Sequence, residues 1–507
     1  MDLTLIPHDD LAALTSWHAR WAGLRVAVLG LGRTGFAVAD TLVDLGVSAL
    51  VVTESAPEAQ ASLLRAIGVP YVAADELPAA PGVPRPTLAE AGSAALADFG
   101  PELVIVSPGF APTHPLLGWV ADAGIPIWGD IELAWRLRDR LGTPAEWLTV
   151  TGTNGKTTTV QLTEHLLRSA GLRAAAVGNI GVPVLDAIVA PEPFDVLVVE
   201  LSSHQLHYLP DTLTPHSSVC LNIAEDHLEW HGSLDAYIAA KGKVYANTRV
   251  ACVYNRADPV TERLVEDAEV TEGARAIGFG LDSPGPSDFG IVDGILCDRA
   301  FGEDRHTTAL ELSTVAELAA VGLGAPHIVA NVLAASALAR AIGVPAASIH
   351  AALGSFRLDR HRIEPVASHA DVHWVDDSKA TNPHAADASL RAYPSVVWVV
   401  GGLLKGVELD ELVQRHASRL RAAVVIGVER ADVLRAFARH APELPVFEVQ
   451  AGDTGQVMPA VVERAAGVAI AGDTVLLAPA AASMDQFTDY SDRGRRFQAA
   501  VHEFYGR

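Results

Sequence analysis

The apolar residues of this chain come in short continuous runs, and each run leads into a turn and then a segment with helical spacing. Runs of this kind are typical of parallel strands that are buried on both faces of a sheet. In the first third of the chain, the runs that predict strands cover residues 25–29, 49–53 and 103–106. Helices are predicted at 36–45 and 130–141, so the pattern predicts a βα series.

Residues 77–100, between the second and third of these strands, do not fit the series. They are rich in alanine, proline and glycine, and recurring proline and glycine are more common in loops than in regular elements. We therefore expect a surface insertion at this point.

Strand and helix signals begin to alternate again near residue 146 and a third time near residue 359. The later runs that predict strands are residues 147–150, 195–199, 372–375, 396–400, 422–426 and 474–477. Strands that alternate with helices form parallel sheets with helices on both faces. The expected fold is three doubly wound α/β domains, Rossmann-like at each end and P-loop ATPase-like in the centre. Their predicted bounds are 1–145, 146–358 and 359–507.

The composition agrees with a globular multidomain protein. A chain of 507 residues is too long for one core, and half of its residues are hydrophobic. No apolar stretch reaches the roughly 18 residues that span a bilayer. Residues 1–20 lack the basic and apolar regions of a secretory signal. We expect no membrane insertion and a cytoplasmic location.

Charge and cysteine content argue against two classes of protein. The formal net charge of -24 would repel nucleic acid, so we expect no nucleic-acid partner. Cys220, Cys252 and Cys297 form no C-x-x-C pair, which argues against a disulfide framework or a zinc knuckle. We expect buried thiols.

The first glycine turn, residues 30–35, has the G-x-G-x-x-G spacing of dinucleotide-binding proteins. Glycine permits a tight turn and a close approach of the backbone to a pyrophosphate at a helix N-terminus. The spacing is also compatible with simple packing of a helix on a strand. A pyrophosphate of UDP would fit this turn as well as one of a nicotinamide dinucleotide.

The second glycine turn is a stronger signal for nucleotide binding. Residues 152–157 are Gly-Thr-Asn-Gly-Lys-Thr, between a predicted strand and a predicted helix. Backbone N–H groups and the lysine would bind nucleotide phosphates, and the Thr157 hydroxyl would bind Mg²⁺. The loop departs from the usual G-x-x-x-x-G-K-[ST] pattern, because position 150 is valine.

Ionisable residues follow further strands of the second domain. Glu200 comes directly after the run 195–199 and is placed to share a cation with Thr157, with a solvated strand-end carboxylate as the alternative. His227 lies in a polar segment beyond the next apolar stretch. By its spacing alone, Lys241 would be an ordinary solvent-facing helix lysine.

Two loops of the third domain follow predicted strands and carry polar residues. Residues 376–382 gather acid, base, hydroxyl and amide groups, and loops of this kind carry function more often than packing. In residues 401–406, Lys405 would bind a carboxylate. An ordinary turn with a surface lysine is the alternative.

Taken together and in this order, five segments resemble the Mur ligase family. They are Gly-Thr-Asn-Gly-Lys-Thr-Thr at 152–158, Glu-Leu-Ser-Ser-x-Gln-Leu at 200–206, Glu-Asp-His at 225–227, Tyr-x-x-Ala-Lys at 237–241 and Asp-Ser-Lys-Ala-Thr-Asn at 377–382. The resemblance covers nearly the whole chain. Within the family, the turn at 30–35 and the loop at 377–382 are similar to those of members that add D-glutamate. The resemblance implies an ATP-dependent amide ligase of peptidoglycan synthesis that joins D-glutamate to UDP-N-acetylmuramoyl-L-alanine through an acyl phosphate.

The resemblance also implies roles for single residues. Catalytic roles fall on Lys156, His227, Lys241 and Lys379. ATP contacts are expected from Gly152, Thr153, Asn154, Gly155, Lys156, Thr157, Thr158, Asn331, Arg362 and Asp377. The UDP substrate is expected at Gly32, Arg33, Thr34, Ser107, Pro108, Gly109, Asn179, Ser202 and Gln205. D-Glutamate is expected at Thr381, Lys405, Ser483, Met484 and Tyr490.

Two Mg²⁺ ions are implied as well. Their expected ligands are Thr157, Glu200, His227 and Lys241, the last as a carbamate. A carbamate has a physical reason, because an ammonium group beside Mg²⁺ would repel the ion whereas an anionic oxygen would bind it. A monomer is expected.

Some positions depart from the family pattern. Ile328 stands where an asparagine is expected, which leaves Asn331 as the adenine contact. Tyr490 stands where phenylalanine is frequent. Residues 53–55 lack the Asp-Thr pair expected to contact uracil.

Three other functions remain open on the sequence alone. A nicotinamide-dependent dehydrogenase would use the turn at 30–35 but leaves the loop at 152–157 unexplained. A regulatory nucleotide-binding protein would bind ATP without amino-acid-dependent release of ADP. A folylpolyglutamate synthase or another muramyl ligase is nearest, and only the first glycine turn and residues 377–382 argue against it.

Overall fold

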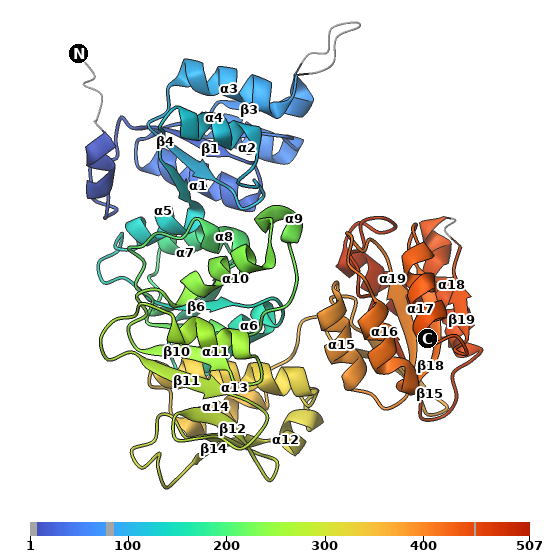
Figure 1. The fold of residues 1–507 in the computed structure, drawn as a ribbon. Coiled ribbons are helices and arrows are strands. Elements are labelled where there is room, and N and C mark those ends of the chain that lie inside the picture. The colour runs from blue at the N-terminus through green and yellow to red at the C-terminus, as the bar shows by residue number, and fades with distance from the viewer. Residues whose placement is uncertain (1–7, 78–85, 451–452, 507) are drawn as a thin grey trace, which may run out of the picture. The chain divides into compact units, whose positions relative to one another are not determined.

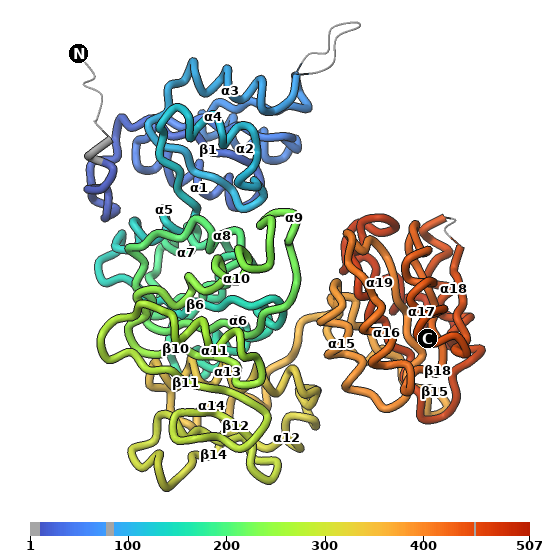
Figure 2. Tube along the Cα trace, viewed as in Figure 1, coloured from blue at the N-terminus to red at the C-terminus, as the bar shows by residue number. Residues whose placement is uncertain are grey.

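The computed structural model describes residues 8–77, 86–450 and 453–506, and Figures 1 and 2 show the course of the chain. The chain divides into two compact units. The first comprises the described residues up to Val315 together with Ala330–Gly354, and the second comprises Ala316–Val329 and the described residues from Ser355 onward. The three predicted domain bounds remain a prediction, although each of the three sheets lies within one of them.

The first sheet is wholly parallel, with the strand order β3-β2-β1-β4-β5. Its strands are β1 (Arg25–Leu29), β2 (Ser48–Thr53), β3 (Tyr71–Ala73), β4 (Leu103–Val106) and β5 (Ile127–Gly129). Its helices are α1 (Arg33–Asp44), α2 (Glu58–Ala66), α3 (Leu88–Phe99), α4 (Pro115–Asp122) and α5 (Asp130–Leu137), and the short 3₁₀ segments are η1 (His8–Ala13) and η2 (Ala74–Glu76). This is the Rossmann-like order that the glycine turn and the strand spacing predict.

The prediction of an insertion at 77–100 is wrong for residues 88–99. These form α3, which begins with a capping box between Thr87 and Glu90. Leu88 and Leu96 are buried in a core shared with strand and helix residues of the first sheet. The alanine-rich composition therefore favours a crossover helix, since alanine has the highest helix propensity. Residues 78–85 lie outside the described residues.

The central sheet has the order β14-β13-β12-β11-β10-β9-β6-β8-β7. Its strands are β6 (Glu146–Thr151), β7 (Ala174–Gly178), β8 (Val196–Glu200), β9 (Ser217–Cys220), β10 (Ala251–Asn255), β11 (Arg275–Phe279), β12 (Asp288–Val292), β13 (Ile295–Asp298) and β14 (Leu310–Thr314). The strands from β7 to β12 pair in parallel, whereas β12, β13 and β14 form an antiparallel extension.

Helices and a 3₁₀ turn connect these strands and follow the last of them. They are α6 (Lys156–Ser169), α7 (Val184–Val189), α8 (Ser203–His207), α9 (Leu228–His231), α10 (Leu234–Gly242), η3 (Lys243–Tyr245), α11 (Pro259–Glu266), α12 (Val315–Ala320), α13 (Pro326–Ala341) and α14 (Ala346–Leu353). Among the described residues, no helix has both the length and the apolar character needed to cross a bilayer. All three cysteines are buried and unpaired, as expected.

The third sheet has the order β15-β16-β20-β17-β18-β19, and only β15 is antiparallel to its neighbour. Its strands are β15 (Glu364–His369), β16 (Val372–Asp376), β17 (Val396–Gly401), β18 (Leu420–Ile426), β19 (Val446–Glu448) and β20 (Thr474–Leu477). Its helices are α15 (Pro383–Arg391), α16 (Asp410–His416), α17 (Ala431–His440), α18 (Thr454–Ala466) and α19 (Tyr490–Phe504), with η4 (Ala417–Arg419) between α16 and β18. Separate apolar cores on its two faces confirm the doubly wound α/β class.

Candidate functional site

The predicted nucleotide and cation residues lie at the carboxyl ends of neighbouring strands of the central sheet. The strands concerned follow one another in the order β9-β6-β8-β7. Because they are parallel, the loops 221–227, 152–157, 201–203 and 179–182 lie along the same edge of the sheet. Ligands of open α/β sheets bind at this edge.

The loop 152–157 has a conformation that depends on glycine. Gly155 has a φ of 83°, in the left-handed region, and directly precedes α6. A Cβ atom at this position would also lie 2.6 Å from Oδ1 of Asn331. Asn331 is only 7% exposed. The structure therefore brings the predicted adenine contact against the loop.

Hydrogen bonds to the loop after β9 and to α10 hold the other side of this loop. The Asn154 N–H donates to Oδ1 of Asn222 at 2.8 Å, and Nδ2 of Asn222 donates to the Asn154 carbonyl at 3.1 Å. The Thr153 hydroxyl lies 2.8 Å from the Tyr237 hydroxyl. Nζ of Lys156 donates to the carbonyls of Gly152 and Thr153 at 2.7 and 2.8 Å. The lysine amine is thus held over the loop that would bind phosphates.

Lys241 is not the exposed helix lysine that its spacing suggests. It is 1% exposed, and its Nζ donates to the Gly152 carbonyl at 2.9 Å and to the Thr151 hydroxyl at 3.3 Å. Burial, followed by the positive charge of Lys156, lowers the pKa of the Lys241 amine to about 7. At neutral pH much of this amine is therefore uncharged and nucleophilic.

Glu200 is buried, so the alternative of a solvated strand-end carboxylate is wrong. Its Oε1 accepts a hydrogen bond from Nδ2 of Asn179 at 2.9 Å. Its Oε2 is also buried and has no hydrogen-bond partner among the described residues. A buried carboxylate oxygen without a donor costs free energy unless a cation binds it. The pair of oxygens therefore suits a hard cation such as Mg²⁺.

His227 lies at the same edge, in a cluster of aromatic rings. It is the N-cap residue before α9, with a φ of 54°, and its side chain is 42% exposed. Its ring centroid is 4.8 Å from that of His204, which packs on Trp230 at 4.4 Å. Burial, followed by the charge of His227, lowers the pKa of His204 to about 3, so His204 is neutral. The sequence analysis missed His204 and Trp230, because no spacing links residues on the separate helices α8 and α9.

The predicted UDP-substrate residues of the first sheet lie around one turn. Gly30 has a φ of 99°, and a Cβ atom there would lie 2.9 Å from Cβ of Ser107. A Cβ atom at Gly35 would clash with the Gly30 carbonyl, whereas Gly32 has open space before it. The turn that contains Ser107, Pro108 and Gly109 therefore adjoins the first glycine turn. This approach requires glycine at positions 30 and 35.

One hydrogen bond joins this turn to the central sheet. Nη1 of Arg33 donates to the Gly181 carbonyl at 3.0 Å, in the loop that also carries Asn179. Ser202 and Gln205 form a capping box at the start of α8. Their observed bonds are structural, and their contact with substrate stays a prediction.

In the third sheet, the predicted amino-acid residues follow the neighbouring strands β16, β20 and β17. The Ala480 N–H donates to the Ala380 carbonyl at 2.9 Å, which joins the loops after β20 and β16. Leu403 and Ala482 exchange two backbone hydrogen bonds, of 2.9 and 3.1 Å, which join the loops after β17 and β20. The loops that carry Thr381, Lys405 and Ser483 are thus brought together.

Individual side chains in these loops differ in exposure. Nζ of Lys379 lies 3.9 Å from the ring centroid of Tyr490, which begins α19. Ser483 is 4% exposed and Met484 is 64% exposed. Lys405 is exposed, with a φ of 55°, so its role stays a prediction beside the surface-lysine alternative.

Asp377 is buried in the loop after β16, beside the residue that precedes β15. Its Oδ1 accepts from the Ile363 N–H at 3.2 Å, and its Oδ2 accepts from the Ser389 hydroxyl. Burial raises the pKa of Asp377 to about 6, against the hydrogen bond from Ser389 and the charge of Arg362, which lower it. The structure therefore brings the two predicted ATP contacts of this unit, Arg362 and Asp377, within electrostatic range of each other.

Comparison with known proteins identifies the family of the chain. The Mur ligase middle domain matches residues 150–339, and the Mur ligase, glutamate ligase domain matches residues 361–481. The UDP-N-acetylmuramoylalanine–D-glutamate ligase of Leifsonia xyli is 64% identical, over 98% of this chain and 96% of the relative. The enzyme of the same name from Streptomyces avermitilis is 53% identical, over 95% of this chain and 98% of the relative.

The chain belongs to the Mur ligase family. Solved Mur-type structures share its fold: UDP-N-acetylmuramate–alanine ligase from Thermotoga maritima has a TM-score of 0.55 at 19% identity, and covers 95% of this chain and 99% of its own. A pseudomurein peptide ligase type C from Methanothermus fervidus has a TM-score of 0.55 at 15% identity, with 95% and 100% coverage. With the family shown, the dehydrogenase and regulatory-protein alternatives no longer apply.

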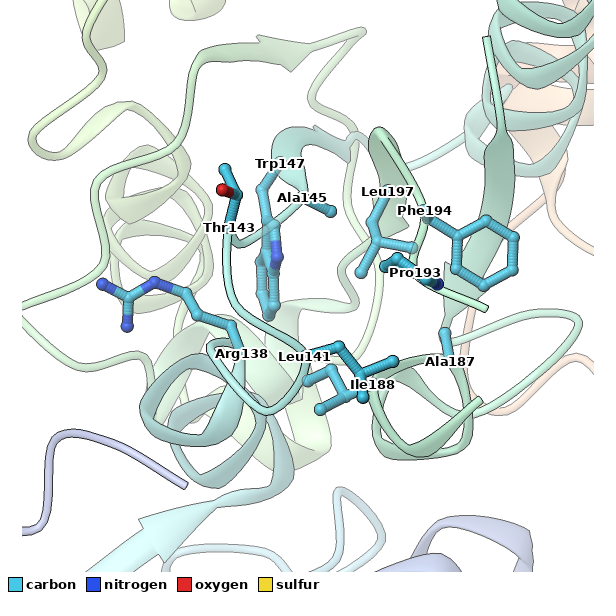
Figure 3. Close-up of a pocket in the computed structure, with 10 residues that line it drawn as sticks. All are labelled: Arg138, Leu141, Thr143, Ala145, Trp147, Ala187, Ile188, Pro193, Phe194 and Leu197. Atoms are coloured by element: carbon cyan, nitrogen blue, oxygen red, sulfur yellow. The ribbon is translucent and has the colours of Figure 1, made fainter. Parts of the chain in front are cut away.

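One cavity of this Mur ligase is lined by residues that do not belong to the predicted site. Its walls are mostly apolar and come from the segment before β6, from β6 and β8, and from α7 and the loop after it (Figure 3). The lining residues are Arg138, Leu141, Thr143, Ala145, Trp147, Ala187, Ile188, Pro193, Phe194 and Leu197. The edge of the central sheet that carries the predicted nucleotide and cation residues is formed by other loops.

Replacing Asp130 by asparagine should favour the folded Mur ligase more at neutral pH than at acidic pH. Asp130 is buried and accepts from Nε2 of Gln205 at 3.0 Å. Burial, against the hydrogen bond from Gln205, raises the pKa of Asp130 to about 6 from 3.8. The folded state therefore binds this proton more tightly, so the carboxyl lowers stability as pH rises from about 4 to about 6.

We expect the change in the free energy of unfolding caused by Asp130→Asn to be about 2–3 kcal/mol more favourable at pH 7.5 than at pH 4, because the amide carries no buried charge. A part common to both pH values reflects the hydrogen bonds that the carboxyl accepts from Gln205 and from the N–H groups of residues 130 and 131. Chemical denaturation at the two pH values measures both differences. An equal change at the two pH values would contradict the pKa explanation.

Proposed function

We propose that this Mur ligase uses ATP to join D-glutamate to UDP-N-acetylmuramoyl-L-alanine in peptidoglycan synthesis. The observation that carries the proposal is the convergence of Lys156, Lys241 and Glu200 at one edge of the central sheet, on a chain whose full-length relatives bear the name of this ligase. An acyl-phosphate mechanism needs a cation on the phosphates and anionic oxygens that hold Mg²⁺. Lys156 would supply the first, and Glu200 and a carbamate on Lys241 would supply the second.

In the proposed reaction, the substrate carboxylate attacks the γ-phosphorus of ATP and the bond to the β-phosphate oxygen breaks. The products of this step are an acyl phosphate and ADP. The amine of D-glutamate then attacks the acyl carbon, the tetrahedral intermediate expels phosphate, and the amine proton goes to a base. Lys156 and the N–H groups of residues 152–157 offset charge on the transferred phosphoryl group, which is an electrostatic and positioning task.

Two Mg²⁺ ions would bind at the same edge. Thr157 and Glu200 are suited to one ion by their oxygen atoms, and the unpartnered Oε2 of Glu200 supports this assignment. His227 would help to hold the second ion. Lys241 would join it as a carbamate, since its uncharged amine can add CO₂ and lose a proton. When bound, the ions would neutralise phosphate charge.

Substrate recognition is divided between sheets. Gly32, Arg33, Thr34 and the Ser107–Pro108–Gly109 turn would bind the UDP moiety of the substrate, with Asn179, Ser202 and Gln205 from the central sheet. In the second unit, Thr381, Lys405, Ser483, Met484 and Tyr490 would orient D-glutamate. Lys379, held over the Tyr490 ring, would offset negative charge near the amino-acid site. Arg362 and Asp377 would contact ATP.

The proposal includes a place for the enzyme in the cell. The proposal places the enzyme in the cytoplasm, as a monomer without a nucleic-acid partner. The net charge of -24 supports the absence of nucleic-acid binding.

The proposal is tested by measuring phosphate release from ATP in the presence of Mg²⁺ and UDP-N-acetylmuramoyl-L-alanine. We expect release with D-glutamate and a product whose mass equals the amide, and little release with L-glutamate, other amino acids or no amino acid. A strong preference for another amino acid or for a folate would favour a different ligase of the family. Release that does not depend on any acceptor would overturn the ligase proposal.

A further inference from the structure

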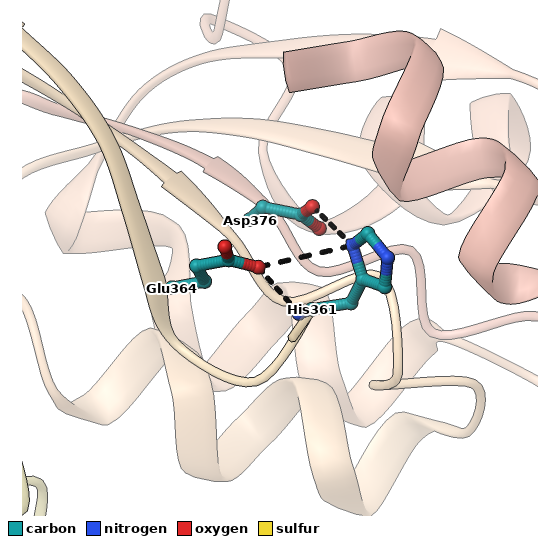
Figure 4. Close-up of side chains that lie close together, drawn as sticks. All are labelled: His361, Glu364 and Asp376. Carbon is teal, nitrogen blue, oxygen red and sulfur yellow. Dashed lines mark hydrogen bonds and ion pairs between the residues drawn. The ribbon is translucent and has the colours of Figure 1, made fainter. Parts of the chain in front are cut away.

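Buried polar side chains gather behind the predicted ATP contacts of the second unit. Figure 4 shows the polar ends of His361, Glu364 and Asp376 turned toward one another. Nδ1 of His361 lies 2.7 Å from Oδ2 of Asp376, and these residues are 3% and 0% exposed. The backbone N–H of His361 donates to Oε2 of Glu364 at 2.7 Å. One histidine thus faces two carboxylates.

The C-terminal helix α19 supplies a fourth member, Gln498. Its Nε2 donates to Oδ2 of Asp376 and to Oε2 of Glu364, both at 2.8 Å. Its Oε1 accepts from Nη2 of Arg360 at 2.8 Å. The amide therefore lies between two carboxylates that would otherwise repel each other, and it donates to both.

Hydrogen bonds account for this cluster without an ion. Ligand atoms of His361, Glu364 and Asp376 lie within 4.8 Å of one another, a spacing that a shared cation would accept. The facing oxygens of the two carboxylates, however, already accept from Gln498 and from His361. We therefore interpret the cluster as a hydrogen-bond network.

Glycine at position 494 lets α19 approach this network. A Cβ atom on Gly494 would lie 2.7 Å from Oδ2 of Asp376 and would clash with the His361 ring. Gly494 precedes Gln498 by one helical turn, so the two residues lie on the same face of α19. The packing of that face thus depends on the small size of Gly494 and on the amide of Gln498.

The backbone joins the network to the predicted ATP contacts. His361 and Ile363 have φ angles of 66° and 45° and flank Arg362. The Ile363 N–H donates to Oδ1 of Asp377 at 3.2 Å, and the Lys379 N–H donates to the His361 carbonyl at 3.2 Å. A shift of the network would therefore move the two predicted ATP contacts, Arg362 and Asp377.

We propose that Gln498 is a positioning residue of the ligase, which holds Arg362 and Asp377 in the conformation that binds ATP. The proposal rests on the proposed function of these two residues. Gln498, which is 8% exposed, acts through its hydrogen bonds to Asp376 and Glu364. Without the amide, the two carboxylates face each other directly, and their repulsion separates the start of β15 from the end of β16.

The test is the variant Gln498→Met, which has a side chain of similar length and no hydrogen-bond donor. We expect the KM for ATP to rise about 10-fold with kcat at saturating ATP changed less than about threefold, because the lost hydrogen bonds weaken positioning rather than chemistry. The unfolding temperature should stay within a few degrees of the wild type. Gln498→Glu should raise the KM further, since it adds a third carboxylate.

Two further variants keep the test decisive. Arg495→Gln changes an exposed residue of the same helix and should leave the KM for ATP unchanged. Arg360→Met removes the hydrogen bond to Oε1 of Gln498 and the 3.7 Å ion pair with Glu364 at the edge of the network. It should raise the KM about two- to threefold even if Gln498→Met fails to fold.

The outcomes separate this proposal from the proposed function. Absence of D-glutamate-dependent phosphate release in the wild type would overturn the proposed function, and calorimetric ATP affinity of the same variants would then test positioning by itself. An unchanged KM and ATP affinity in folded Gln498→Met, or equal effects in Arg495→Gln, would overturn the positioning role.

Discussion

Replacing Lys156 by alanine should lower kcat about 10³-fold or more while the protein remains folded. The Lys156 amine, now held by the Gly152 and Thr153 carbonyls, lies on the loop whose N–H groups would bind the phosphates. Removal of a group that offsets charge in a phosphoryl-transfer transition state typically has an effect of this size. Initial rates of D-glutamate-dependent phosphate release measure the loss.

Lys243→Ala is the matched control for this prediction. Nζ of Lys243 also donates to a carbonyl, that of His207, at 2.8 Å, but Lys243 is exposed and outside the glycine loop. We expect its activity to stay within about twofold of the wild type. Comparable losses of rate in both variants, or an unchanged rate in Lys156→Ala, would contradict a catalytic role for Lys156.

Replacing Lys241 by alanine should lower kcat about as much as Lys156→Ala does. A short carboxylic acid such as formate should restore part of the activity. The buried amine has a pKa of about 7, so it is available to react with CO₂ at neutral pH. An added carboxylate would supply the anionic oxygens of the missing carbamate in the space left by the side chain. Rates of phosphate release with and without formate give the comparison.

A direct measurement complements this rescue. Wild-type protein in ¹³C-labelled bicarbonate should show a carbamate signal by nuclear magnetic resonance, and Lys241→Ala should lack it. Lys156→Ala is the control for nonspecific labelling and should keep the signal. Full wild-type activity in buffer depleted of CO₂, together with no rescue by formate, would overturn the carbamate assignment.

The sequence predicts the strands that are continuous apolar runs and misses several others, including β10, in which Ala251, Cys252 and Val253 are buried. Residues 196–199 of β8 and 396–400 of β17 are continuous apolar runs, and each strand lies between two neighbouring strands of its sheet. β7 is mostly alanine, and β12 to β14 are partly exposed antiparallel strands, so neither shows the apolar run that was used as a signal. The helix at 88–99 was missed because the prolines just before it favour a loop, and they outweighed the helix propensity of its alanines.

The sequence likewise predicts some features of the candidate site and misses others. Motifs that lie within one loop, such as residues 152–157, could be read directly from the sequence. Burial could not, since the spacing around Lys241 and Glu200 suits a surface residue as well as a buried one. Gln498 and His204 were missed because their partners are distant in the sequence and become neighbours only through the order of the strands.

The contact between Gly155 and Asn331 has a consequence for the evolution of this nucleotide loop. A side chain at position 155 is excluded twice, by the left-handed backbone and by the asparagine oxygen 2.6 Å from the Cβ position. Shortening Asn331 would relieve only the second obstacle and would remove the predicted adenine contact. No single substitution therefore makes room for a side chain at position 155. Replacement of Gly155 would also require a change at Asn331, and the enzyme with only one of the two changes would be impaired.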